Sequence, residues 1–400
     1  MAIGLENLAN AEHAESSHRR AAAHDLEVSL LAGEQRLTEI AASWNALAGE
    51  IPFRRHEWLA TWWRRFRAPG DELFAPLIYD GTGRLVGLAP WYVRRDRWLG
   101  RVVRFLGTGR VSSEYLTVLA APGAEHEVAR RLARWLTGEA ARCWDLIDLD
   151  GVDPGDIVLQ PMLAELSAGG HGLYQRQRER TWRLELPSSW ESFLGRLSKG
   201  RRAKLRVLER RLTDGKVQLR QAHDAATLHE GLEVFDRLHR ARRLTLGDGG
   251  CSIVPGFRRF LQDAATACLR GGALRLQWIE IEREPAAIEI GLLGGKTLYY
   301  YQTGMNPRLA EISPGWLLQV ASIQRAINDG LVCFDFLRGD EPYKASWGAR
   351  PLQLAQFRIA ARRPWARLRH GAWRAAVEAK KHWSRAPAGK PPVLESEATC

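Results

Sequence analysis

Residues 297–339 read "TLYYYQTGMNPRLAEISPGWLLQVASIQRAINDGLVCFDFLRG", and the fold prediction starts from this stretch. Residues 297–305 are rich in β-forming aromatic residues and predict a strand. Residues 313–330 have the apolar spacing of a helix, and residues 332–339 predict a second strand. The stretch therefore predicts one strand–helix–strand unit.

The helix of this unit opens with Ser313, Pro314 and Gly315. Ser is a favoured N-cap, Pro suits the first helical turn, and Gly leaves the backbone open to close approach. A helix N-terminus offers free N–H groups and a positive dipole end to a pyrophosphate. A well-capped helix that binds nothing has the same sequence, so both interpretations remain open.

The second strand carries an acid within an apolar run. Asp335 stands between Phe334 and Phe336, whose side chains point to the opposite face of the strand. Burial in a cleft would raise the pKa of the Asp335 carboxyl and suit it to general-base catalysis. Alternatively, Asp335, Arg338 and Asp340 form an ion-pair network that locks the two halves of the chain together. Polar and aromatic candidates for substrate contact follow the strand: Arg338, Asp340, Glu341, Tyr343, Lys344 and Trp347.

The same order of elements occurs twice along the chain. Residues 274–339 predict strand, turn, strand, strand, helix and strand, and residues 73–152 predict a similar order. An internal duplication is the simplest explanation, with the boundary near residues 182–200. The individual expectations are strands at 73–80, 84–93, 102–107 and 114–120, helices at 37–47, 56–66 and 126–143, and a turn at 284–286.

Three further features are candidates for binding. Tyr300 lies on the strand face opposite Tyr299 and Tyr301, which suits either a groove lined by hydroxyls or an aromatic core strand. Residues 197–212 predict a basic amphipathic helix that includes Lys199 and Arg202. This helix is either a solvated surface or a phosphate or nucleic-acid contact. His239, near Arg242, is a candidate base or substrate contact, although a lone helical histidine is often neither.

The composition bounds the class of protein. The chain has 400 residues, a net charge of +12 and a pI near 9.8, which indicates an anionic partner such as nucleic acid, a phosphate-bearing substrate or an acidic membrane surface. The five cysteines have no metal-ligand spacing, so neither a disulfide framework nor a zinc site is expected. No secretory signal and no membrane-spanning segment is expected, which favours a cytoplasmic protein.

The second half of the chain resembles the GNAT-like domain of the CelD/BcsL-like (BioF2-like) family, which is associated with cellulose and exopolysaccharide biosynthesis. The resemblance rests on "LSKGRRAKLRVLERRL", "LRLQWIEIEREPAAIEIGL", "LYYYQTGMNP", "ISPGWLLQVASIQRAINDG" and "FDFLRGDEPYKASWG". A weaker repeat covers residues 26–180, and the paired arrangement resembles the FemA/FemX peptidoglycan aminoacyl-transferases.

The resemblance implies an α/β fold of tandem GNAT-like domains. Each is a mixed, mainly antiparallel twisted sheet flanked by helices. The expected divisions are a disordered segment at 1–24, an N-terminal GNAT-like domain at 25–184, a C-terminal acyltransferase domain at 185–362, and a basic helix with a loose tail at 363–400. The first half lacks an opening like "SPG" before its helix, so it is expected to bind the acceptor or act as a scaffold.

The resemblance also implies site residues and a co-substrate. The co-substrate is acetyl-CoA or another acyl-CoA, and no metal is expected. Its pantetheine arm would lie along the strand at 297–305, and its pyrophosphate at the helix opening. The implied cofactor-binding residues are Tyr300, Tyr301, Gln302, Thr303, Ser313, Pro314 and Gly315. The implied catalytic residues are Asp335, Tyr343 and His239. The implied substrate-binding residues are Lys199, Arg202, Arg242, Arg338, Asp340, Glu341, Lys344 and Trp347.

The resulting expectation is an acetyltransferase that acts on a sugar or exopolysaccharide precursor. The usual Arg/Gln-x-x-Gly-x-Gly/Ala loop is reduced to "SPG", so a FemX-like transferase that uses aminoacyl-tRNA is an alternative, and a non-catalytic scaffold of a polysaccharide synthase is another. The helix predicted at 364–383 is basic and bears tryptophans. It either lies on the anionic inner face of the cytoplasmic membrane or docks on the folded body.

Overall fold

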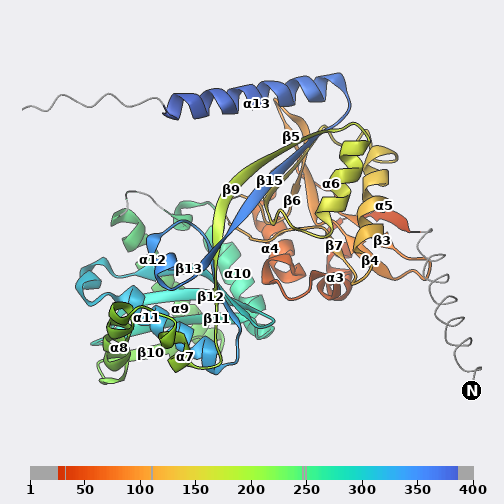
Figure 1. The fold of residues 1–400 in the computed structure, drawn as a ribbon. Helices are drawn as coiled ribbons and strands as arrows, with labels where there is room; N and C mark the ends of the chain where they lie inside the picture. The colour runs from red at the N-terminus through yellow and green to blue at the C-terminus, as the bar shows by residue number, and fades with distance from the viewer. Residues whose placement is uncertain (1–25, 32, 110, 246, 248–249, 386–400) are drawn as a thin grey trace, which may run out of the picture.

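A computed structural model of the protein describes residues 26–31, 33–109, 111–245, 247 and 250–385. The disorder predicted for residues 1–24 and the end of the predicted tail lie outside these ranges. The described residues form an α/β fold in which helices flank two twisted sheets (Figure 1). Every strand pair is antiparallel except β13–β14 and β6–β8.

The larger sheet has eleven strands and the smaller sheet has four. In spatial order, the larger sheet contains β10 (Val217–Gln221), β11 (Leu274–Ile281), β12 (Glu284–Gly294), β13 (Thr297–Met305), β14 (Cys333–Arg338), β9 (Gly172–Glu185), β15 (Arg350–Ala360), β8 (Leu146–Val152), β6 (Gly100–Phe105), β5 (Trp91–Asp96) and β2 (Glu72–Leu73). The smaller sheet contains β1 (Glu27–Leu30), β3 (Pro76–Tyr79), β4 (Leu85–Leu88) and β7 (Leu119–Ala120).

The helices of the first half are α2 (Gly33–Glu39), α3 (Ala41–Ala48), η1 (Pro52–Arg54), α4 (His56–Phe66), α5 (Glu125–Thr137) and α6 (Leu159–Ala168). Those of the second half are α7 (Trp190–Gly195), α8 (Lys199–Thr213), α9 (Ala225–Thr245), η2 (Cys251–Ile253), α10 (Phe257–Arg270), η3 (Pro307–Ile312), α11 (Pro314–Asn328), α12 (Pro342–Ser346) and α13 (Pro364–Arg385).

The second half contains the predicted strand–helix–strand unit as β13, α11 and β14. The sheet separates two hydrophobic cores, with α9 on one side and α11 on the other. Tyr299 and Tyr301 belong to the first core and Tyr300 to the second, which confirms their predicted alternation. This alternation follows from the period of two in a strand.

The first half repeats this unit, because α5 connects the parallel strands β6 and β8. The two halves are not separate sheets, however. Strand β9 pairs with β14 through Thr181–Glu185 and with β15 along most of its length. Strand β15 also pairs with β8, so the end of the second half returns to the sheet of the first. Figure 1 shows β9 and β15 running side by side from one half to the other.

Several local predictions were wrong. Residues 73–80 and 84–93 each break into two strands that belong to different sheets, and Pro90 explains the second break because it has no N–H to donate. Residues 114–120 form only the two-residue β7. Residues 37–47 divide between α2 and α3. Residues 284–286 begin β12, and the turn is made instead by Glu282 and Arg283, which both have positive φ.

Candidate functional site

Strands β13 and β14 part soon after they begin. Their parallel pairing covers Thr297↔Cys333, Leu298↔Phe334 and Tyr299↔Asp335, although β13 continues to Met305. Leu337 has a φ of 56°, and the pairing of β14 with β9 shifts register between Asp335 and Arg338. Since β14 bends away there, the backbone of β13 beyond Tyr299 has no partner in β14.

A pocket of about 330 Å³ lies near the end of β13 where the strands have parted. Its walls come from both faces of the sheet, because Arg242 belongs to α9, Trp316 to α11 and Tyr343 to α12. The lining residues are Arg242, Ala287, Ile288, Tyr300, Thr303, Gly304, Met305, Ala310, Ser313, Gly315, Trp316, Leu318, Gln319 and Tyr343. The pocket is partly apolar and reaches the N-terminus of α11.

The start of α11 is open to this pocket through Ser313 and Gly315. Pro314 occupies the first helical turn as predicted, but the Ser313 hydroxyl does not cap the helix. Ser313 instead has left-handed backbone angles, φ 58° and ψ 53°, so the prediction of a side-chain cap was wrong. A Cβ built at Gly315 would lie 3.5 Å from the Met305 sulfur, which leaves the backbone there accessible.

Helix α8 brings positive charge to the mouth of the pocket. The Lys204 Nζ lies 4.6 Å from the centroid of the Trp316 ring, and the Arg201 guanidinium carbon lies 5.3 Å from it. Trp316 is in the first turn of α11 and lines the pocket. Two cations beside a helix N-terminus form a site that favours an anion such as a phosphate.

Two phenols face the pocket. Burial raises the pKa of the Tyr343 hydroxyl, and burial also holds the pKa of the Tyr300 hydroxyl well above its usual value. Both hydroxyls therefore remain neutral near pH 7 and can donate a proton. Gln319 positions Tyr300, since its amide nitrogen lies 3.4 Å from the Tyr300 hydroxyl and its carbonyl oxygen accepts from Trp347 Nε1 at 2.8 Å.

Asp335 does not line the pocket, and its side chain lies on the face of β14 opposite Phe334 and Phe336, which pack in the second core. The Tyr115 hydroxyl donates to its Oδ2 at 2.6 Å, and the Leu337 N–H donates to its Oδ1 at 2.8 Å. Arg183 Nε lies 3.6 Å from the same Oδ2. The carboxyl is fully buried, and burial raises its pKa to about 6. This arrangement matches the interpretation in which Asp335 joins the halves, because Tyr115 belongs to the first half.

His239 is buried behind the pocket rather than in its wall. Its Nδ1 lies 2.8 Å from the Thr303 carbonyl oxygen, and its Nε2 lies 3.2 Å from Cys251 Sγ. Burial raises the pKa of the Cys251 thiol to about 12, so the thiol is not an activated nucleophile. Gln302 is 3.6 Å from the same sulfur. Tyr301 donates to the Val111 carbonyl and packs in the first core.

Most of the predicted substrate contacts serve the structure itself. Arg338 donates to Glu114, and Lys344 is buried with Nζ donating to the carbonyls of residues 337–339. Three others have partners within the protein: Arg202 donates to the backbone carbonyls of Leu194 and Leu197, Asp340 accepts from Trp182 Nε1, and Glu341 pairs with Lys344. Trp347 is buried, and Lys199 is exposed at the start of α8. Only Arg242 of this set lines the pocket.

Sequence reasoning missed several residues. Trp316 and Gln319 line the pocket, and Gln319 had a signal, since it is a polar residue on the buried face of α11. Glu289 is fully buried beside the pocket lining, accepts from Ser322 and Gln277 through Oε1, and has its pKa raised to about 8 by burial. Nothing local in the sequence distinguished it from an exposed strand residue.

The first half contains a second pocket of about 340 Å³ beside an analogous parting of strands. Strands β6 and β8 pair only through Val102↔Leu146 and Val103↔Ile147. The lining residues are Trp62, Phe66, Tyr92, Arg94, Arg104, Thr108, Gly109, Val111, Asp148, Asp150, Val254 and Gln356. The buried Trp62 Nε1 has no partner among the described residues.

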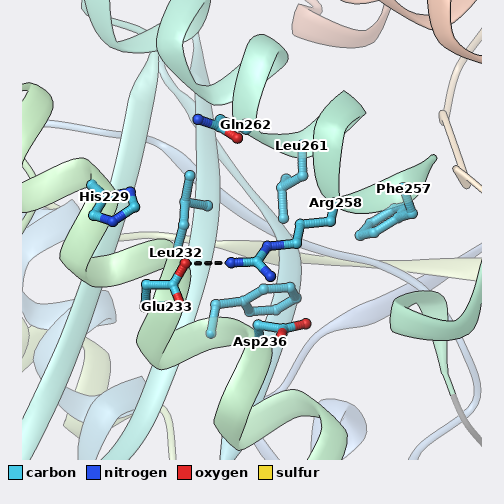
Figure 2. A pocket seen from close by; sticks show the side chains of 9 residues that line it. His229, Leu232, Glu233, Asp236, Phe257, Arg258, Leu261 and Gln262 are labelled. Carbon is cyan, nitrogen blue, oxygen red and sulfur yellow. Dashed lines mark hydrogen bonds and ion pairs between the residues drawn. The ribbon is translucent and has the colours of Figure 1, made fainter.

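A further groove lies between two helices and has no strand residue in its lining. The groove between α9 and α10 in Figure 2 measures about 60 Å³ and is bridged by the ion pair of Arg258 with Glu233. No group of three or more His, Cys, Asp or Glu side chains in the described part of the chain is placed to hold a metal ion. None of the described helices is both long and apolar enough to cross a membrane.

Comparisons with known proteins find one matching family and several similar structures. Residues 199–345 match the family described as acetyltransferase (GNAT) domain. The structure of FemX is similar, with a TM-score of 0.57 and 12% identity over 82% of this chain and 96% of that chain. The C-terminal domain of a putative lysylphosphatidylglycerol synthetase from Agrobacterium fabrum gives a TM-score of 0.49 and 9% identity over 85% and 96%. A tandem GNAT protein of the clavulanic acid pathway gives 0.45 and 15% over 85% and 99%.

No curated protein matches the chain. The family match and the FemX fold nevertheless confirm the predicted fold class: the chain has a GNAT-like α/β fold, and residues 199–345 are similar to the GNAT acetyltransferase domain family.

Proposed function

We propose that the protein is an acyltransferase that binds an acyl-CoA, most simply acetyl-CoA, where β13 and β14 part. The observation that carries the proposal is the pocket at this point, which opens onto the N-terminus of α11. The backbone of β13 beyond Tyr299, which has no partner in β14, suits the amides of a pantetheine arm. The start of α11, with Arg201 and Lys204 nearby, suits the phosphates.

The chemistry assigned to the pocket is acyl transfer with little covalent participation by the protein. An acceptor amine or hydroxyl attacks the thioester carbonyl, a C–N or C–O bond forms, and the C–S bond breaks. The Tyr343 phenol gives its proton to the departing thiolate, and the proton released by the acceptor restores the phenol. Positioning supplies most of the acceleration, and proton transfer supplies a smaller part.

The acceptor proposed from the family resemblance is a sugar or another exopolysaccharide precursor, as in the CelD/BcsL-like family. An aminoacyl-tRNA donor of the FemX kind is the second candidate, favoured by the net charge of +12 and by the basic face of α8. The donor class is therefore the first quantity to measure.

Isothermal titration of the full chain with acetyl-CoA, longer acyl-CoAs and desulfo-CoA tests the donor. We expect saturable binding of acetyl-CoA and no competition from tRNA. The Tyr343→Phe variant is expected to keep the Kd for acetyl-CoA. Its rate of acetyl transfer to an amine acceptor, measured as release of free CoA thiol, is expected to fall about 100-fold, the scale of general-acid catalysis. Binding of charged tRNA without binding of any CoA ester would replace this proposal with the second candidate.

The pocket of the first half is proposed to hold the acceptor. Both pockets lie near the same segment of β13. Thr303 of this segment lines the pocket of the second half, and the Tyr301 hydroxyl donates to the carbonyl of Val111, which lines the pocket of the first half. Aromatic side chains beside two aspartates and two arginines suit a polar ligand with an apolar face, such as a sugar. The unpartnered Trp62 Nε1 supports a ligand oxygen there.

The partly exposed Asp150 offers a test of the acceptor site. With UDP-glucosamine as the probe, Asp150→Asn is expected to weaken binding of the probe about 10-fold, the scale of one charge-assisted hydrogen bond. The Kd for acetyl-CoA should stay unchanged. Glu165→Gln, an exposed change on α6, is the matched control. Equal weakening of acetyl-CoA binding by Asp150→Asn would show a general structural effect and contradict a separate acceptor site.

A further inference from the structure

One face of helix α13 packs on the sheet of the first half. Ala366 and His370 are buried, and the His370 ring stacks on Trp373 with centroids 5.7 Å apart. The Arg358 guanidinium of β15 lies 3.5 Å from the Trp373 ring centroid. These contacts follow the helical spacing i, i+4 and i+7, so they define the face that meets the sheet.

A neighbouring face of α13 is apolar and exposed. Trp365 is 70% exposed and Leu368 is 61% exposed. Ala372 and Ala376 continue the same face at helical spacing and are also exposed. An exposed apolar stripe next to a docked stripe is not needed to hold the helix on the sheet.

The turn between β5 and β6 lies beside α13 and carries another large exposed apolar side chain. Trp98 in that turn is 76% exposed. The turn lies against α13, because a Cβ built at Gly100 would be 3.1 Å from the Arg369 guanidinium. Arg369 follows Leu368 directly, on the same flank of the helix as Trp365. Figure 1 shows α13 along one end of the molecule, far from α8 and α11.

The charge around these side chains is positive. Arg97 and Arg369 are exposed, and the Arg97 guanidinium carbon lies 5.7 Å from the Trp98 ring centroid. Neither forms an ion pair with an acid in the described ranges. The nearby carboxylates are already engaged, since Asp96 accepts from backbone N–H groups of the turn and Asp145 pairs with Arg363 and Arg101.

We propose that Trp98, Trp365 and Leu368 form a surface that inserts into the headgroup region of an anionic lipid bilayer. Tryptophan favours the membrane interface because its ring is amphipathic, and arginine beside it is attracted by anionic lipids. The surface combines both features on two elements far apart in the sequence. It is separate from the proposed transfer site, so the two proposals stand or fall independently.

Flotation of the full chain with vesicles of phosphatidylcholine alone, or with added phosphatidylglycerol, tests this surface. We expect binding to the anionic vesicles, reduced at high salt because screening shortens the reach of the charges. The triple variant W98S/W365S/L368S is expected to lose at least about 10-fold in partitioning. The double variant R97Q/R369Q is expected to lose the preference for anionic lipid.

The matched control is I157S/L219S/V332S, which changes three exposed apolar residues elsewhere. It should bind vesicles as the unchanged chain does, and all variants should keep the same Kd for acetyl-CoA. Absence of binding to anionic vesicles, or equal loss in the control, would overturn the proposal. So would a dimer that the triple variant converts to a monomer, because a second copy would then cover this surface.

Discussion

Replacing Gly315 with aspartate is expected to weaken acetyl-CoA binding about 100-fold while the protein stays folded. The substitution places a carboxylate at the N-terminus of α11, inside the pocket where a phosphate is proposed to bind. Two unit charges about 5 Å apart repel by about 3 kcal/mol at an effective dielectric constant of about 20, which is slightly more than 100-fold in Kd. The side chain has room, since its Cβ would make an ordinary contact with Met305.

Stability should not fall with this change, because an acid in the first turn of a helix interacts favourably with the helix dipole. Gly315→Asn is the neutral isostere and should keep most of the binding. Isothermal titration gives the Kd of each variant, and thermal melting gives its stability. If Gly315→Asp and the unchanged chain bind acetyl-CoA equally, the phosphates do not lie at this helix.

Replacing Asp335 with alanine is expected to destabilise the protein by about 3–5 kcal/mol, the cost of breaking a buried polar network by removing one partner. The change leaves the Tyr115 hydroxyl, the Leu337 N–H and the Arg183 guanidinium without their shared acceptor. Since Tyr115 and Asp335 belong to different halves, the interface between the halves should loosen. Urea unfolding and limited proteolysis measure the loss.

Asp335→Asn separates this role from general-base catalysis. If Asp335 serves the interface, the Asn variant at low temperature should retain acetyl-CoA binding and transfer within a few-fold. A variant that folds and binds acetyl-CoA normally but loses transfer more than about 100-fold would instead make Asp335 the base. Tyr115→Phe should reproduce part of the stability loss and none of a catalytic loss.

The pH dependence of stability follows from the same carboxyl. Its pKa in the folded state is raised from 3.8 to about 6, so the folded state favours the protonated form. Stability from this group is fully present below pH 3.8 and is lost as the pH rises through 6. A shift of about two units corresponds to about 3 kcal/mol. The Asn variant should therefore become more stable relative to the unchanged chain as the pH rises from 4 to 7. A difference in melting temperature between the two proteins that stays constant over this range would contradict the raised pKa.

The sequence by itself determined the elements whose signals are local. Strand β13, helix α11 and strand β14 follow from residue spacing and from the Pro and Gly at the helix start, and the basic face of α8 follows from its helical periodicity. The alternation of Tyr299, Tyr300 and Tyr301 also follows, because a strand has a period of two. Six of the site residues that the family resemblance implied line one pocket: Tyr300, Thr303, Ser313, Gly315, Arg242 and Tyr343.

The tertiary structure alone decided which residue Asp335 of β14 contacts and which strands join the halves. Asp335 meets Tyr115 across 220 positions of the chain, and β15 pairs with β8 as well as β9. The tertiary structure also gives Ser313 left-handed backbone angles, and its side chain does not cap the helix. Most of the charged residues after β14 have partners within the protein. These outcomes depend on contacts between residues distant in sequence, whose burial and partners no local pattern encodes. A polar residue in an apolar run signals a buried polar contact, but only the fold selects its partner.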